Sequence, residues 1–255
     1  MPSKIAVTPA FFAGVYNRFT EALVGRDCGK KCAPLNGGEP VCCSTQHAVP
    51  VMHKEEFNLL RSRSDLWRPF KAYDASTREI VDTLIETCTT AECRGAASCE
   101  RANRSIACRA FPFFPYLTRE GKFIGLATYW DFEDRCWVMS NLRSVRGKFV
   151  REFVAAFEHV MRVDRDEFDG FMEQSACMRR VFTRWRRPIV LIGREGGYFK
   201  IMPRTAKIAK ATERDLRPRG AYASLKAYRT AAAEADAFIA RQRRREEKKN
   251  PRKAA

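Results

Sequence analysis

The first half of the chain is dominated by the segment Cys28-Gly29-Lys30-Lys31-Cys32-Ala33-Pro34-Leu35-Asn36-Gly37-Gly38-Glu39-Pro40-Val41-Cys42-Cys43. Glycines and prolines are spread through it, and these residues are typical of loops rather than of helices or strands. A loop that holds four cysteines and few apolar residues needs something other than a hydrophobic core to order it. The segment therefore predicts an irregular module that is organised around its sulfur atoms.

The remaining cysteines extend this pattern. Nine of the ten lie within residues 28–136, with the spacing Cys28-x3-Cys32-x9-Cys42-Cys43-x44-Cys88-x4-Cys93-x5-Cys99-x8-Cys108-x27-Cys136. Thiolates are soft ligands that select zinc, copper(I) or iron–sulfur clusters. A tetrahedral zinc ion and a four-iron cluster each need four thiolates. The cysteines therefore suffice for one site with spares or for two sites.

Some of these cysteines have a competing explanation. We expect a helix that begins with the capping box Ser76-Thr77-Arg78-Glu79 and carries Cys88 on its apolar face, so burial in the core explains Cys88 as well as ligation does. Cys177 stands apart on a later helix and is better explained as a helical thiol. In an extended segment Cys42 and Cys43 would point to opposite faces, so they need a turn to reach one metal, or they serve two centres.

The expected compartment argues against disulfides. No apolar run reaches about 18 residues, and the N-terminus lacks the pattern of a secretory signal. We therefore expect a cytoplasmic protein without a membrane span, and disulfides do not persist in the reducing cytosol. Metal binding is the preferred explanation of the cysteines.

The chain is strongly basic, and much of the excess lies at its C-terminal end. Of 255 residues, 47 are Lys or Arg and 30 are Asp or Glu, which gives a formal net charge of +17. Residues 204–255 hold 16 of the basic residues and 6 of the acidic ones. The spacing of Leu225, Tyr228, Ala232, Ala235 and Ile239 predicts a helix there that docks weakly or pairs with a protein partner. The charge of this tail need not touch the metal site.

Nucleic acid is a second candidate partner. Besides the tail, one later helix interleaves basic and aromatic side chains, namely Arg179, Arg180, Phe182, Arg184, Trp185, Arg186 and Arg187. The arginines of such a patch are suited to phosphate groups, whereas the aromatic residues fit the apolar stripe of the helix. A zinc-stabilised nucleic-acid-binding protein is therefore the first alternative function.

Periodicity and turn residues indicate an α+β fold that is mostly helical, with two small antiparallel hairpins beside the cysteine-rich irregular metal module. The expected helices cover residues 9–25, 55–61, 76–88, 142–162 and 164–186 and part of the tail. The expected hairpins turn at Glu120-Gly121 and at Arg194-Glu195-Gly196-Gly197. We expect three parts: residues 1–140, the metal-binding module with its N-terminal helix; residues 141–203, a helical pair and a hairpin packed on it; and residues 204–255, a basic helical tail that is partly disordered.

Several motifs together resemble the YkgJ-type cysteine-cluster family, whose members are described as zinc- or iron-chelating. The likeness covers about residues 28–136 and rests on Cys28-x3-Cys32, Cys42-Cys43, Val49-Pro50-Val51-Met52-His53-Lys54-Glu55-Glu56, Cys99, Arg104, Cys108-Arg109-Ala110-Phe111-Pro112 and Cys136. The resemblance implies a bound metal, with a [4Fe-4S] cluster preferred over Zn²⁺.

We therefore predict a metal-binding protein in which the centre has a structural or redox role. The first ligands that we name are Cys42, Cys43, Cys99, Cys108 and Cys136, followed by Cys28, Cys32 and Cys93. The FliB-like flagellin lysine N-methylases are a related branch of the family, so a lysine N-methylase-like enzyme is the second alternative. No residue set for methyl-donor chemistry is evident, and whether the protein is catalytic stays open.

Other polar residues give weaker signals. His47 and His53 follow Cys43 closely and could bind the metal or donate hydrogen bonds to its ligands. A solvent-facing position in a loop explains each of them better. His159 fits a structural position on a helix. Asp131, Glu133 and Asp134 precede Cys136 and are best explained as a polar turn.

Overall fold

The computed structural model describes residues 6–45 and 48–249, with the side chains of residues 242–249 left aside. Its α-helices are α1 (Pro9–Arg18), α2 (Gly29–Cys32), α3 (Lys54–Arg63), α4 (Ala75–Asp82), α5 (Ile106–Ala110), α6 (Gly147–Val163), α7 (Arg165–Arg184) and α8 (Leu225–Lys249). Its strands are β1 (Val51–His53), β2 (Trp67–Pro69), β3 (Cys88–Cys93), β4 (Phe113–Leu117), β5 (Phe123–Thr128), β6 (Ile189–Gly193), β7 (Tyr198–Ile201) and β8 (Ile208–Lys210). This is an α+β fold, and about half of it is helical.

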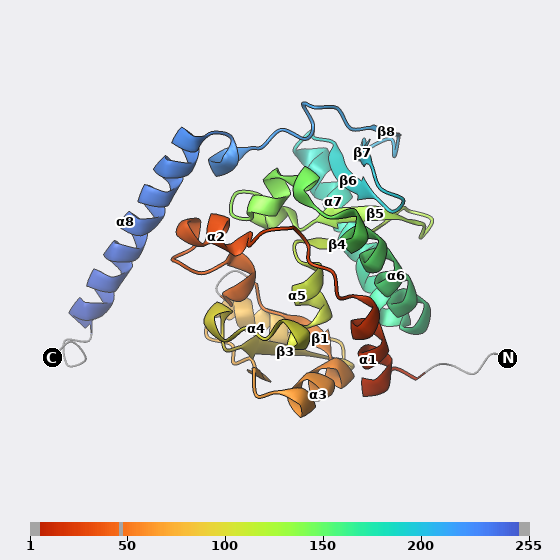
Figure 1. The fold of residues 1–255 in the computed structure, drawn as a ribbon, viewed down its shortest axis with the longest axis horizontal. Helices are drawn as coiled ribbons and strands as arrows, with labels where there is room; N and C mark the ends of the chain where they lie inside the picture. The colour runs from red at the N-terminus through yellow and green to blue at the C-terminus, as the bar shows by residue number, and fades with distance from the viewer. Residues whose placement is uncertain (1–5, 46–47, 250–255) are drawn as a thin grey trace.

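Two antiparallel sheets organise these elements (Figure 1). The smaller sheet has the order β1-β3-β2, and the larger has the order β4-β5-β6-β7-β8. Both predicted hairpins are confirmed as β4–β5 and β6–β7, but they are not separate, because β5 pairs with β6 through Gly125 opposite Gly193. A Cβ atom on Gly125 would lie 2.4 Å from the carbonyl oxygen of Ile192, so this pairing requires glycine.

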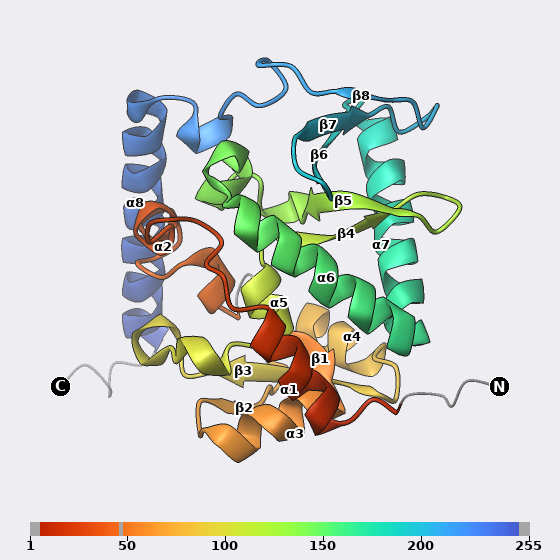
Figure 2. The ribbon, with the colours of Figure 1, turned by 45° about the vertical axis from the view of Figure 1, so that its right-hand side comes forward.

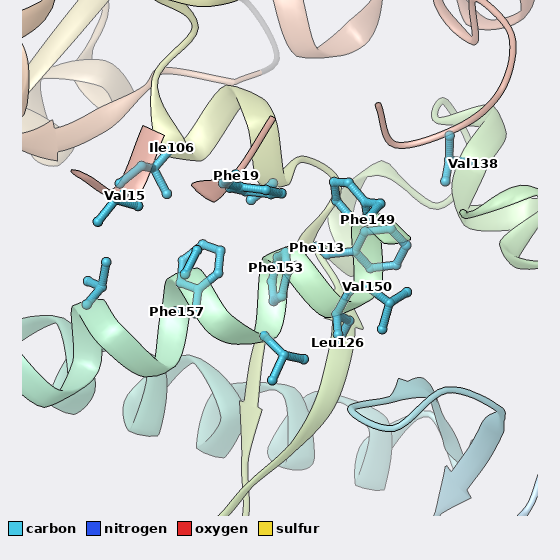
Figure 3. Close-up of a cluster of buried hydrophobic side chains, with 14 of the residues drawn as sticks. Val15, Phe19, Ile106, Phe113, Leu126, Val138, Phe149, Val150, Phe153 and Phe157 are labelled. Carbon is cyan, nitrogen blue, oxygen red and sulfur yellow. The ribbon is translucent and has the colours of Figure 1, made fainter. Parts of the chain in front are cut away.

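Strands β4, β5 and β6 of the larger sheet are largely buried on both faces, whereas β8 is exposed. Phe113, Leu117 and Leu126 face a core shared with α1 and α6, whereas Phe114, Tyr116 and Leu191 face a second core shared with α7. Figure 3 shows how Phe149, Phe153 and Phe157 of α6 line up between the strands and α1. Their spacing of four residues places them on one side of the helix, which is why the sequence predicts this element correctly. The rigid half of the molecule is therefore the sheet with α6 and α7.

Two helices differ from the expectation. Helix α1 starts at Pro9 after the N-cap Thr8, as predicted, but it ends at Arg18 rather than near Gly25. Helix α4 starts after Asp74, whose side chain forms the capping box with Thr77, and it ends at Asp82. The predicted helix over residues 76–88 is thus wrong in its second half, and Cys88 begins strand β3 instead.

The basic tail does not stand apart from the cysteine segment. Strand β8 pairs with β7, so the larger sheet continues past the boundary that we predict at residue 203. Helix α8 then runs beside α2 in both views (Figures 1 and 2), and the Tyr228 hydroxyl donates to the carbonyl oxygen of Lys31 at 3.0 Å. The tail therefore contacts the cysteine segment through α8, and the three-part division itself stays a prediction. Among the described residues, no helix is long and apolar enough to span a membrane.

We expect the stability of the protein to depend on pH because of Glu167, a buried carboxyl near the start of α7. Burial, together with Asp164, Glu56 and Asp166, raises the pKa of Glu167 from 4.5 to about 7. The folded protein then holds a proton that the unfolded chain has lost, so stability is highest below about pH 4.5 and falls as the pH rises to about 7. The substitution Glu167→Gln is expected to remove this fall and to raise the free energy of unfolding at pH 8 by about 1–3 kcal/mol. Urea denaturation of the wild type and the variant at pH 4 and pH 8 measures the two free energies of unfolding.

The matched control for that measurement is Glu234→Gln, which changes an exposed carboxylate on α8. It is expected to leave both free energies within about 0.5 kcal/mol of the wild type. If Glu167→Gln and the wild type have the same free energy of unfolding at pH 8, the ionised Glu167 carboxylate does not destabilise the folded protein.

Candidate metal centre

The structure brings together all eight cysteines that we predict as ligands. Cys28 and Cys32 frame α2, Cys42 and Cys43 lie in the 3-10 helix η2 (Val41–Cys43), and Cys93 ends β3. Cys99 follows the 3-10 helix η3 (Ala96–Ser98), Cys108 lies in α5, and Cys136 precedes the 3-10 helix η6 (Trp137–Ser140). Each interacts electrostatically with at least one other cysteine of the set.

The other two cysteines lie elsewhere. Cys88 interacts with the acidic start of α7, where Glu167 is its strongest charged neighbour. Cys177 lies on α7 near Arg180. We name the first set of eight the eight-cysteine cluster. All ten cysteines are free thiols.

A close backbone approach joins the first two cysteine pairs. Gly29 lies against Pro40, and a Cβ atom there would come within 2.8 Å of the Cγ atom of that proline. The Asp27 carboxylate accepts a hydrogen bond from the Gly29 amide at 2.9 Å and fixes the start of α2. Glycine is therefore required between Cys28 and Cys32 if this segment is to lie next to Cys42 and Cys43.

The adjacent cysteines do not diverge as they would in an extended segment. They lie in a 3-10 turn, and their Sγ atoms are 3.9 Å apart. Either thiol can donate the hydrogen bond between them, and this hydrogen bond lowers the pKa of Cys43 and raises that of Cys42. Cys43 is thus the member of the pair that ionises first, and an ionised thiol is the form that binds metal.

Arg104 is the cation of the cluster. Its Nε atom donates to the Sγ atom of Cys99 at 3.1 Å, and its charge also interacts with Cys43 and Cys108. A half-buried guanidinium beside several thiols offsets the negative charge that they acquire when they ionise. Sequence reasoning singled out Arg104 only through the family motif, not through its position next to sulfur.

Burial keeps other members of the cluster neutral in the absence of a metal. It raises the pKa of Cys28 to about 11 and those of Cys108 and Cys136 to about 12. Metal ligands must be deprotonated, so binding at these thiols releases protons and becomes tighter as the pH rises.

A ring of polar contacts that sequence reasoning missed holds the loops around the cluster. The Asn36 side chain donates to the carbonyl oxygens of Cys32 at 2.7 Å and of Arg135 at 3.5 Å. The Tyr222 hydroxyl donates to the same Arg135 oxygen at 2.7 Å. Within the described part of the chain, Asn36 Oδ1 is buried without a hydrogen-bond partner. The contacts to Arg135 join residues far apart in sequence, so no local sequence pattern predicts them.

A second network fixes α5, the helix that carries Cys108. The buried Glu56 carboxylate accepts from the Tyr16 hydroxyl at 2.5 Å and from the Ile106 amide at 2.7 Å. Arg109 lies over the Tyr16 ring and donates to the carbonyl oxygens of Phe19 and Arg104. Glu56 and Arg109 of the family motif thus support the backbone here, whereas Arg104 of the same motif donates to sulfur.

The two histidines within the described residues have partners outside the cluster. His53 is buried, not in a solvent-facing loop, and its Nδ1 atom accepts from the Glu55 amide at the start of α3. His159 packs against Phe11, as expected of a structural residue. His47 lies outside the described residues.

The predicted basic-aromatic patch is only partly a surface. Arg179 is buried and donates to the Leu117 carbonyl oxygen at 2.8 Å, so its assignment to a phosphate-facing surface is wrong. Arg187 forms two hydrogen bonds with Glu133, the acidic residue that we assigned to a polar turn. Trp185 is 45% exposed and does not belong to the core, unlike Phe182. Much of the charge in this patch is therefore already paired.

No protein-family model, curated protein or solved structure matches the chain. The likeness to the YkgJ-type family accordingly stays an expectation that rests on the sequence motifs alone. As the side chains are placed, no group of three or more His, Cys, Asp and Glu residues within residues 6–45 and 48–249 is arranged to hold a metal ion. Sulfur atoms therefore gather in one region without converging on a single point.

Proposed function

We propose that the protein is a metal-binding protein and that thiolates of its eight-cysteine cluster bind an iron–sulfur cluster. The observation that carries the proposal is the meeting of eight cysteines from segments between residues 28 and 136, while Cys88 and Cys177 lie elsewhere. Thiols are soft donors, which suits iron–sulfur clusters and zinc.

The resemblance to the YkgJ-type family is what favours an iron–sulfur cluster over a single zinc ion. Both centres need four thiolates, and the eight cysteines suffice for either. When bound, such a cluster would tie together loops that bury few apolar side chains, which is a structural role.

Anaerobic purification followed by metal analysis and absorption spectroscopy tests this proposal. We expect a brown protein with broad absorption near about 400 nm and with iron and acid-labile sulfide in equal amounts. Cys177→Ser is the matched control and should keep the full absorption, because that thiol lies on α7. A colourless protein with stoichiometric zinc would overturn the choice of metal. A protein without either metal would overturn the proposal as a whole.

A further inference from the structure

We propose that a cavity lined by Arg187, Arg217 and Arg219 binds a phosphate group. The group is either free inorganic phosphate or the phosphate of a larger molecule. The cavity has a volume of about 50 Å³. It lies where three stretches of the chain meet, namely residues 128–142, 178–190 and 215–219. Its lining within the described residues contains no cysteine, so this inference does not depend on the proposed metal centre.

Apolar side chains form part of the lining. Met178 and Phe182 of α7 are buried there, and the Trp130 ring meets the Phe182 ring edge-on, with the ring centroids 6.4 Å apart. Leu216 joins them from the segment between β8 and α8. Apolar walls hold little water that could screen a charge, so an ion pair is stronger beside them than on an open surface.

Two of the three arginines are held in place by the protein. The Arg187 guanidinium donates to both carboxylate oxygens of Glu133, at 3.0 and 2.6 Å. The Arg219 amide donates to the Ser140 hydroxyl at 3.4 Å, and the Arg219 guanidinium donates to the carbonyl oxygen of Asp215 at 3.4 Å. A guanidinium has five N–H donors, so both arginines retain donors for a ligand.

The third arginine, Arg217, has all of its donors available. Within the part of the chain that the structure describes, it lines the cavity and forms no hydrogen bond or ion pair. Guanidinium groups bind phosphate oxygens through two parallel hydrogen bonds, which gives both strength and orientation. Arg217 and Arg219 are therefore the residues that we assign to the phosphate.

The charges around the cavity do not cancel. Its lining contains three arginines and two carboxylates, which belong to Glu133 and Asp215. The Asp215 carboxylate accepts from the Lys200 ammonium at 2.9 Å, so its charge is already balanced. Arg187 and Arg219 share Glu133, and their nitrogen atoms lie 2.6 and 3.7 Å from the same carboxylate oxygen. Two positive charges remain, which matches the dianion of a phosphate and exceeds the single charge of a carboxylate.

The size of the cavity fits the same group. A water molecule needs about 10–15 Å³ of such a volume, so the cavity has room for about four waters. The four oxygen atoms of a phosphate need comparable space. A larger phosphorylated molecule would place its phosphate in the cavity and leave the rest outside.

Isothermal titration calorimetry at pH 8 and about 0.1 M salt tests the site, with inorganic phosphate, phosphoserine and acetate as probes. Arg217→Gln and Arg219→Gln should each weaken phosphate binding by about five- to tenfold, because each removes charge-assisted hydrogen bonds. Glu133→Gln should tighten it by about the same factor, because the anion that competes for Arg187 and Arg219 is gone. The matched control is Arg229→Gln, an exposed position of α8 outside the lining, which should stay within about twofold of the wild type.

Saturable phosphate binding with this pattern of variants supports the inference. Tighter binding of phosphoserine than of inorganic phosphate identifies a phosphorylated molecule as the source, and equal binding identifies the free ion. Three results would each overturn the inference: neither phosphate probe binds up to about 10 mM, acetate binds as tightly as phosphate, or both arginine variants keep the wild-type affinity. Arg217 makes no polar contact with the described residues, so Arg217→Gln keeps the test decisive if another variant fails to fold.

Discussion

Removal of the metal is expected to release the loop over residues 28–43 while the larger sheet stays folded. In this segment only Gly29, Cys32 and Val41 are buried, and its helical pieces are single turns. Structural metal sites contribute their binding energy directly to folding. We expect amide hydrogen exchange in residues 28–43 to become at least about 100-fold faster after anaerobic chelation, which corresponds to about 3 kcal/mol of local stability.

Hydrogen exchange followed by mass spectrometry gives the readout for both parts of the chain in one experiment. Helix α6 is the internal control, because Phe149 and Phe153 anchor it in the core and it carries no cysteine. Its exchange should stay within about twofold of the metal-bound protein. Equal protection of residues 28–43 with and without metal would contradict a structural role of the centre.

The substitution Glu56→Ala is expected to cost about 3–5 kcal/mol of unfolding free energy. Glu56 is 4% exposed and joins three helices, because it lies on α3 and accepts from Tyr16 of α1 and from the first residue of α5. Its removal leaves two buried donors without a partner, and each costs about 1–3 kcal/mol. Chemical denaturation at constant pH measures the loss.

Two further variants separate the hydrogen bonds from the helix itself. Tyr16→Phe removes one donor and keeps the carboxyl group, so it should cost about 1–2 kcal/mol. Asn58→Ala changes an exposed position of the same helix and should stay within about 0.5 kcal/mol of the wild type. If Glu56→Ala were no more destabilising than Asn58→Ala, the network around Glu56 would not support the fold.

Local chemistry explains which elements the sequence predicts correctly. Turn residues such as Gly121 and Gly196 adopt positive φ and mark the two hairpins, and the apolar spacing of α6 and α7 marks the long helices. The joining of the hairpins could not be predicted, because the pairing of Gly125 with Gly193 is set by packing between distant segments. Cys88 was misplaced for a related reason: the apolar period continues beyond Asp82, but the helix does not.

Some features of the candidate site are likewise predictable from the sequence, and others are not. Counting and spacing identified the eight cysteines that meet, and the capping signal correctly placed a helix start near Thr77. The mutual arrangement of the cysteines was not predictable, since it depends on Asn36, Arg104 and Tyr222, whose partners lie elsewhere in the chain. The sequence does not decide between a turn and an extended segment at Cys42-Cys43, because two adjacent residues do not reveal their backbone conformation.

The contact between Tyr228 and Lys31 joins residues 197 positions apart, and it sets an order of events during synthesis. A ribosome adds about 5–20 residues each second, so about 10–40 seconds pass between the two residues. During that interval the first four cysteines have been made, but the helix that will cover them has not. The first four cysteines are therefore made well before the helix that packs beside them, and completion of that helix ends this interval.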